Sequence, residues 1–134
     1  ILIAFSAVQN AIPVQAYFLF AANIFWAIAY DSHYAVSDMR DDKALNVYSV
    51  PLTFQEMTIK IIFLSYLSMF CILCFIGLME QYSYQYYLAL LIASAIAIYC
   101  CNLGKKLDSE KNFKAFLLNN YLGFFIFLGF LSQR

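Results

Sequence analysis

The sequence predicts an all-α fold, a polytopic transmembrane helical bundle, and this prediction rests on composition and on long charge-free stretches. Of the 134 residues, 64% are hydrophobic and 12% are charged, with a mean hydropathy of +0.73. A soluble domain is typically about half apolar and about a quarter charged. Three continuous stretches without Asp, Glu, Lys or Arg approach or exceed the ~20 residues that a helix needs to cross a bilayer. They are residues 61–79, 81–104 and 115–133.

About five spans are expected within one domain. Residues 1–8 are interpreted as the end of a first span, and Pro13 is expected to begin the next helix because proline suits a first turn but not a helix interior. Ile1 already lies in an apolar run with no basic segment before it, so we expect residues 1–134 to be the C-terminal part of a longer transmembrane domain. The remaining spans are predicted near 14–30, 56–78, 85–103 and 113–131, with an acidic segment at 31–55.

Two of the four cysteines form a CxxC pattern, which in other contexts marks a redox pair or half of a zinc site. Cys71 and Cys74 lie in the middle of a predicted span, with no second CxxC and no histidine nearby. Cysteine in such a place behaves as a small hydrophobic residue, so we interpret the pair as structural.

The basic residues predict the topology. Because successive loops alternate sides, the acidic segment and the polar loop 104–112 are expected on one side of the membrane. Seven of the eight basic residues lie in or beside these two segments, and only Arg134 falls on the other side. The excess of positive charge places that side in the cytoplasm, or in the matrix of a mitochondrion. The seven are Arg40, Lys43, Lys60, Lys105, Lys106, Lys111 and Lys114.

The acids are concentrated where the second span ends. Residues 1–30 contain no charged side chain, and residues 31–42 then hold four of the chain's eight acids. At about 100° per residue, a helix that continued through Asp42 would gather a polar and aromatic face within an arc of roughly 160°, with Arg40 and Lys43 pointing the other way. The residues on this face are Asn23, Trp26, Tyr30, Asp31, Tyr34, Asp38, Asp41 and Asp42.

Carboxylates on one helix face repel one another unless a cation compensates their charge. Asp31 and Asp38 would lie about 10 Å apart along the axis, and Asp38 and Asp42 about 6 Å. Mg²⁺ is the cation expected there, because it takes oxygen ligands and is often shared between one or two carboxylates and substrate phosphates. It also makes a diphosphate a better leaving group. The alternative is a solvated acidic loop that only helps to set the topology.

Two separated motifs then give a resemblance. Residues 23–42 (NIFWAIAYDSHYAVSDMRDD) resemble the second aspartate-rich motif of the UbiA family of membrane prenyltransferases, closest to its 4-hydroxybenzoate polyprenyltransferase branch. Residues 113–123 (FKAFLLNNYLG) resemble the FKAF-xx-NN-xx-G pattern of that branch's last span. The resemblance implies a nine-span fold of which this chain covers roughly the last five spans. It also implies that the protein lies in a bacterial or mitochondrial inner membrane.

The resemblance also implies an activity: Mg²⁺-dependent transfer of a polyprenyl group from polyprenyl diphosphate to 4-hydroxybenzoate in ubiquinone biosynthesis, with no nucleic-acid partner. The family's first aspartate motif lies upstream of the part matched here, so we expect this chain alone to be inactive. Asp31, Asp38 and Asp42 match the motif's catalytic acids, and Asp41 joins them as a metal ligand. The substrate-binding candidates are Asn23, Tyr30, Tyr34, Arg40, Lys43, Asn119 and Asn120.

Some roles stay open at this point. Trp26, Tyr30 and Tyr34 are either walls that stabilise an allylic cation by cation–π contact or ordinary packing aromatics. The two amides at 119–120 either bond between helices or contact the aromatic acceptor. His33 occupies a variable position of the motif and is not expected to be a ligand.

Two positions after the acids depart from the branch's pattern. Asn46 stands where it usually has Gly, and Tyr48 where it usually has Lys. If that lysine contacts diphosphate, its loss weakens the site unless Lys43 or Arg40 substitutes.

Two alternative functions remain. One is a related prenyltransferase with another acceptor, such as a naphthoate, homogentisate or haem. The other is a transporter or channel fragment whose acids bind a coupling cation. Acids at a helix end argue against the second alternative, because transporter sites usually lie near the bilayer midplane.

Overall fold

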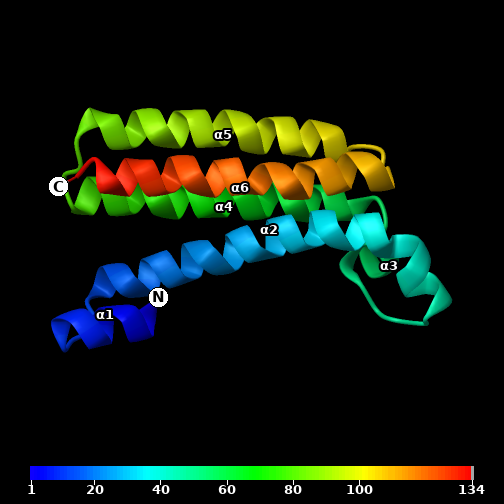
Figure 1. Ribbon diagram of the computed structural model, residues 1–134, viewed down its shortest axis with the longest axis horizontal. Helices are drawn as coiled ribbons and strands as arrows, with labels where there is room; N and C mark the ends of the chain where they lie inside the picture. The colour runs from blue at the N-terminus through cyan, green and yellow to red at the C-terminus, as the bar shows by residue number, and fades with distance from the viewer. Residues whose placement is uncertain (134) are drawn as a thin grey trace.

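The computed structural model describes residues 1–133 and is all-helical over that range, as the sequence predicts (Figure 1). Its six helices are α1 (Leu2–Gln9), α2 (Val14–Ala44), α3 (Val50–Phe54), α4 (Met57–Met79), α5 (Tyr84–Gly104) and α6 (Ser109–Leu131). By length and composition, α4, α5 and α6 are able to cross a membrane. They match three of the predicted spans to within a few residues. The two predicted N-terminal spans are not confirmed, since α1 is short and α2 is not in that apolar set.

Helix α2 joins the second predicted span and the first part of the acidic segment in one continuous helix of 31 residues, so the condition for a single polar face, a helix that continues through Asp42, is met. At ~1.5 Å per residue it is about 46 Å long, well beyond the ~30 Å of a bilayer's hydrocarbon core. The chain then reverses at Asn46 and forms the short α3, which was not predicted. Pro51 lies in the first turn of α3, where its missing N–H costs no hydrogen bond.

The loop between α5 and α6 is shorter than predicted. Gly104 is the last residue of α5, and α6 begins at Ser109 rather than at 113. The reason is a helix cap: the Asp108 carboxylate accepts a hydrogen bond from the Lys111 backbone N–H at 2.9 Å. The predicted loop 104–112 is therefore wrong at both ends, and only residues 105–108 connect the helices.

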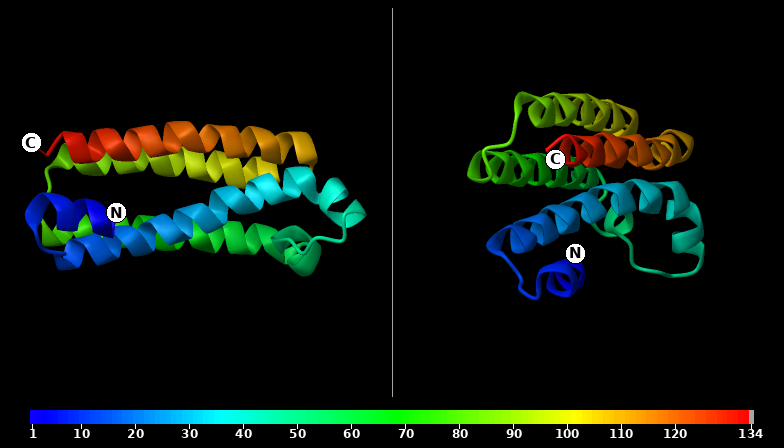
Figure 2. Two further views of the ribbon diagram at one scale, coloured as in Figure 1. Left: turned by 60° about the horizontal axis from the view of Figure 1, so that its bottom comes forward. Right: turned by 60° about the vertical axis from the view of Figure 1, so that its left-hand side comes forward.

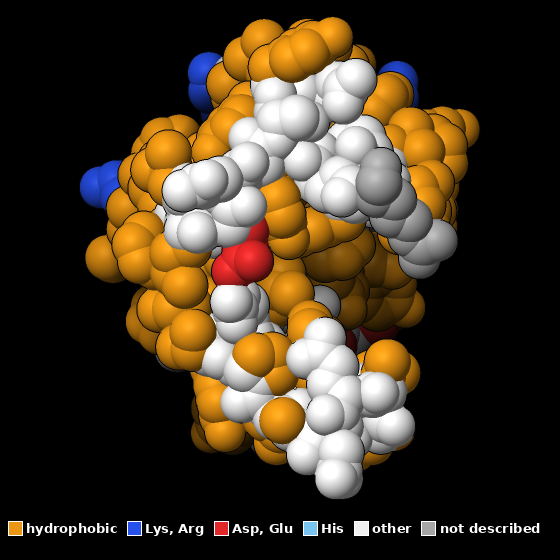
Figure 3. All heavy atoms as spheres, turned by 90° about the vertical axis from the view of Figure 1, so that its left-hand side faces the viewer, with side chains coloured by type: hydrophobic (Ala, Val, Ile, Leu, Met, Phe, Trp, Pro, Cys, Tyr) orange, Lys and Arg blue, Asp and Glu red, His pale blue; other side chains and the backbone are white. Residues whose placement is uncertain are grey.

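Helices α4, α5 and α6 lie side by side, while α2 runs obliquely across α4 and α6 (Figures 1 and 2). The C-terminal end of α2, the short α3 and the 105–108 loop all lie at one end of the bundle. There the Ser109 hydroxyl donates to the Ser37 carbonyl at 2.8 Å, so the two charged segments do share one side. Figure 3 looks onto the opposite end, which is mainly hydrophobic or uncharged. Arg134, expected on that side, lies outside the described residues.

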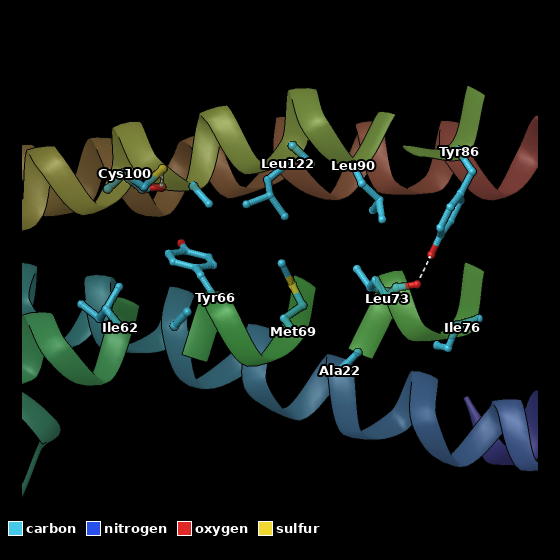
Figure 4. Packing of buried hydrophobic residues seen from close by; sticks show 14 residues of the cluster. Ala22, Ile62, Tyr66, Met69, Leu73, Ile76, Tyr86, Leu90, Cys100 and Leu122 are labelled. Atoms are coloured by element: carbon cyan, nitrogen blue, oxygen red, sulfur yellow. Dashed lines mark hydrogen bonds between the residues drawn. The ribbon is translucent and has the colours of Figure 1, made fainter. Parts of the chain in front are cut away.

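Helix α4 is the centre of the core (Figure 4). Its Ile62, Met69 and Leu73 are at most 3% exposed and face neighbours on the surrounding helices. Many of the facing residues are small, which lets helix backbones approach closely in a membrane; they include Ala22, Ala29, Ala93, Ala97 and Ala115. All four cysteines are free.

Candidate functional site

A cavity of about 330 Å³ opens between α2 and α6. The two motifs that are far apart in the sequence supply its whole lining, because residues of 23–42 face residues of 113–123 across it. Four of the predicted substrate-binding residues are in this lining, together with Trp26 and an aromatic residue of α6 that was not predicted. The lining residues are Asn23, Trp26, Tyr30, Phe116, Asn119 and Asn120.

The two adjacent asparagines of α6 differ in their surroundings. Asn119 is 4% exposed, and its Oδ1 accepts hydrogen bonds from Trp26 Nε1–H at 3.0 Å and from the Tyr66 hydroxyl at 2.9 Å. Its Nδ2 donates to the Ala115 carbonyl at 2.9 Å, so the amide joins α2, α4 and α6. Asn120 is exposed and lines the cavity. The hydrogen-bonding interpretation therefore holds for Asn119, whereas Asn120 has an amide available to a ligand.

Gly123 leaves room for the Trp26 indole to pack against α6. A Cβ added at Gly123 would lie 2.6 Å from Cη2 of Trp26 and 3.0 Å from its Cζ2. The ring therefore rests directly on the backbone of α6, and any side chain at 123 would displace it. Together with the hydrogen bond to Asn119, this contact fixes the orientation of the indole at the wall of the cavity.

A row of aromatic rings leads from the cavity towards the acids. Trp26 contacts Tyr30 edge-to-face, with centroids 5.8 Å apart. Phe116 of α6 then lies against both Tyr30 (6.1 Å) and Tyr34 (5.1 Å). The sequence signal for Phe116 was its spacing, since it precedes the two asparagines by three and four residues and so shares their helix face. The row thus bridges two helices.

The row of rings ends at Asp38. The hydrogen bond and negative charge of Asp38 raise the pKa of the Tyr34 hydroxyl, with a smaller contribution from Asp42. Asp38 and Asp42 are partly buried and one helical turn apart, whereas Asp31 and Asp41 are exposed. Within residues 1–133, no three acidic, histidine or cysteine side chains are gathered closely enough to hold a metal by themselves. The four predicted metal ligands are therefore a row along a helix and not one cluster.

The two basic residues predicted to bind substrate, Arg40 and Lys43, do not line the cavity between α2 and α6. Arg40 is exposed, and Lys43 lines a separate hollow of about 280 Å³ beside α3. Asn46 and Tyr48 line the same hollow as Lys43.

Asn46 has a backbone φ of 57°. This left-handed conformation favours Gly and is tolerated next best by Asn, so Asn46 in place of the usual Gly keeps the turn. Tyr48, at 95% exposed, makes no comparable structural contribution. Of the two departures from the branch's pattern, only Tyr48 in place of Lys changes the chemistry that the segment offers.

His33 is fully buried between α2 and α6. Its Nδ1 donates to Oδ1 of Asn112 at 2.8 Å. Burial lowers the pKa of His33, and the hydrogen bond to Asn112 opposes that shift. A Cβ at Gly104 would lie 3.1 Å from both the imidazole and the amide, so this glycine makes room for the pair.

Comparison with known proteins gives matches over almost the whole chain. The model of the UbiA prenyltransferase family matches residues 1–129. A 4-hydroxybenzoate octaprenyltransferase of Methylobacillus flagellatus is 36% identical over 97% of this chain and 44% of its own length. One of Haemophilus ducreyi is 40% identical over 96% of this chain and 46% of its own length. The chain thus spans about half the length of these relatives. No solved structure matches it.

Proposed function

The chain belongs to the UbiA prenyltransferase family, and from this we propose that it supplies part of the active site of a membrane-bound 4-hydroxybenzoate polyprenyltransferase. The enzyme would transfer a polyprenyl group from its diphosphate to the aromatic ring, a step of ubiquinone biosynthesis. The observation that carries the proposal is the cavity between α2 and α6, whose aromatic wall leads directly to the acids of α2. The reaction needs a chamber with aromatic walls next to a site for diphosphate, and an aromatic cavity beside a row of acids supports that assignment.

The acids are suited to hold the diphosphate through Mg²⁺. Asp38 and Asp42 offer two carboxylates one turn apart, and Mg²⁺ typically takes one or two carboxylates while keeping waters and substrate phosphates as its other ligands. The donor set therefore fits this ion without a cluster of three acids in the chain. When bound, Mg²⁺ neutralises charge on the departing diphosphate. Asp31 and Asp41 are exposed, and they would contact Mg²⁺ only indirectly, through bound waters.

The aromatic row is suited to the carbon chemistry. When the bond from the prenyl carbon to the diphosphate oxygen breaks, the diphosphate leaves with the electron pair and an allylic cation remains. The faces of Trp26, Tyr30 and Tyr34 stabilise such a cation, each by up to ~2 kcal/mol when desolvated. The acceptor ring then attacks ortho to its hydroxyl, and the ring loses a proton as the new carbon–carbon bond forms. Asn23 and Asn120 are the polar groups of the cavity available to orient the acceptor.

The proposal places the protein in a bacterial or mitochondrial inner membrane, with the acids on the cytoplasmic or matrix side. The three membrane-length helices and the bias of basic residues to the acid-bearing end support this orientation. The relatives are named as octaprenyltransferases, which favours an octaprenyl donor.

The test uses membranes that contain the protein to which this chain belongs, supplied with octaprenyl diphosphate, 4-hydroxybenzoate and Mg²⁺. Asp38→Asn and Asp42→Asn are each expected to lower kcat/KM by at least ~100-fold, as loss of a charge that stabilises a transition state typically does. Glu56→Gln, which removes an exposed acid at the same end of the bundle, is the matched control and should keep full activity. Full activity in either Asp variant would refute the assigned roles. Transfer to a naphthoate or homogentisate in preference to 4-hydroxybenzoate would reassign the acceptor.

A further inference from the structure

A second, larger hollow lies on the α4–α5 side of the bundle and takes no residue from α2 or α6. Its volume is about 510 Å³, and its polar rim consists of Lys60, Asn102 and Lys105. Lys60 lies in the first turn of α4 and Lys105 directly follows the end of α5, so both cations are at the same end of the bundle as the acids. The lining contains no acidic residue. The hollow is therefore an electropositive mouth that the transfer reaction does not use.

Below the mouth the hollow is apolar and faces outward. Phe63, Leu64 and Ile98 line it and are 51%, 57% and 59% exposed. Since α4 and α5 are both of membrane-spanning length and composition, such exposed apolar side chains are suited to contact with lipid. A free inorganic anion would occupy the mouth and leave the apolar part unfilled.

The apolar part continues along the helix pair towards the middle of the bundle. A further hollow of about 300 Å³ shares Phe63 and Ile98 with the first and extends to Phe70. From Lys60 to Phe70 is ten residues of α4, about 15 Å along the axis. This is half of the ~30 Å hydrocarbon core, the depth of one leaflet. The combined groove thus has the length of a single acyl chain, with two cations at its membrane-surface end.

We propose that the groove between α4 and α5 binds an anionic phospholipid of the acid-bearing leaflet. The lipid phosphate lies between Lys60 and Lys105, Asn102 donates to a phosphate or ester oxygen, and one acyl chain lies along Phe63 and Ile98. Lysines beside transmembrane helices favour anionic over neutral headgroups. The lipid fills the gap between α4 and α5, which pack against each other less extensively than α5 packs against α6. Its role is to hold the two helices together at their charged ends.

The test measures lipid retention and thermal stability of the purified protein that contains this chain. The protein is incorporated into vesicles of phosphatidylcholine with or without phosphatidylglycerol, extracted in mild detergent, and analysed for bound lipid by native mass spectrometry. The unmodified protein should retain phosphatidylglycerol and show a higher Tm when it is present. The Lys60→Gln/Lys105→Gln variant should bind it about 30-fold more weakly, the loss expected for two lysines near the membrane surface.

The matched control is Lys106→Gln/Lys114→Gln, which removes two exposed cations from the same end of the bundle but not from the groove. It should retain phosphatidylglycerol like the unmodified protein. Ile98→Trp, which fills the apolar part and leaves both lysines in place, should also lose the lipid. Equal retention by both double-lysine variants, equal retention of phosphatidylcholine, or displacement of the lipid by millimolar inorganic phosphate would each overturn the proposal. The proposal would also be overturned if another segment of the protein occupied the groove and no lipid bound there.

Discussion

Two aromatic rings in this molecule rest on glycines of a neighbouring helix, one beside the cavity and one near the α4–α5 turn. Trp26 rests on Gly123, and Tyr86 rests on Gly77, where an added Cβ would lie 2.7 Å from the Tyr86 ring. Both rings also donate a hydrogen bond. The indole N–H donates to a side-chain amide at 3.0 Å, and the Tyr86 hydroxyl donates to the backbone carbonyl of Leu73 at 2.9 Å (Figure 4).

The surroundings of the two rings differ. Tyr86 is fully buried and is enclosed by Tyr82 and Phe130 within 5.2 Å between ring centroids. Trp26 is only partly buried and forms a wall of the cavity. The same packing arrangement therefore stabilises the fold at one position and orients a surface for a ligand at the other. If this distinction is correct, equivalent substitutions at the two positions will act on stability in one case and on prenyl transfer in the other.

Removal of the rings should have the largest effects. Tyr86→Ala leaves a cavity in a closed core and should lower the free energy of unfolding by ~3–5 kcal/mol, measured by denaturant titration in detergent. Trp26→Ala should cost less stability but lower kcat/KM for prenyl transfer by about 30-fold, the equivalent of one cation–π contact of ~2 kcal/mol. Tyr84→Ala, at a position 77% exposed, is the control and should change neither quantity. Similar losses of stability for both ring variants would remove the distinction between the two regions.

Addition of one methyl group at each glycine should have intermediate effects. Gly77→Ala pushes Tyr86 out of place, and overpacking of this kind typically costs ~1–3 kcal/mol of stability. Gly123→Ala moves Trp26 towards the cavity, where the ring has room, so less stability is lost. Prenyl transfer should instead fall by about 10-fold, less than on removal of the ring, because small displacements of a binding wall are costly to catalysis. An active Gly123→Ala enzyme with reduced stability would contradict this assignment.

A change of pH should have the smallest effect, through the buried His33 of α2. Burial lowers the pKa of His33, so below its unfolded value of ~6.5 the unfolded chain binds more protons than the folded one. Stability should therefore fall as the pH is lowered from 7.5 to 5.5, by at most ~1.4 kcal/mol per unit. His33→Gln, which keeps a donor for Asn112, should remove this slope. The same slope in the variant would show that another group titrates.

Local sequence patterns were sufficient to predict the three helices of membrane-spanning length. Continuous apolar runs gave the approximate bounds of α4, α5 and α6, and the rotation of about 100° per residue placed Tyr34 and Asp38 on one face. The short α3 was missed because five residues carry too little periodic signal. The start of α6 was misplaced because Asp108 and Ser109 are polar, although Asp108 caps the helix. The metal and catalytic roles of the acids were inferred from the motif and remain predictions.

The sequence by itself determined that this protein is a helical membrane protein with four of its eight acids on one helix face, because hydropathy and helical phase depend only on residue order. The tertiary structure decided which residues surround the cavity. Phe116 joins its wall, Asn119 bonds to Trp26, and Gly123 accommodates the indole, all through contacts between α2 and α6. Such contacts join residues about 90 positions apart, and no local pattern specifies them. They depend on the angle and distance at which the two helices pack.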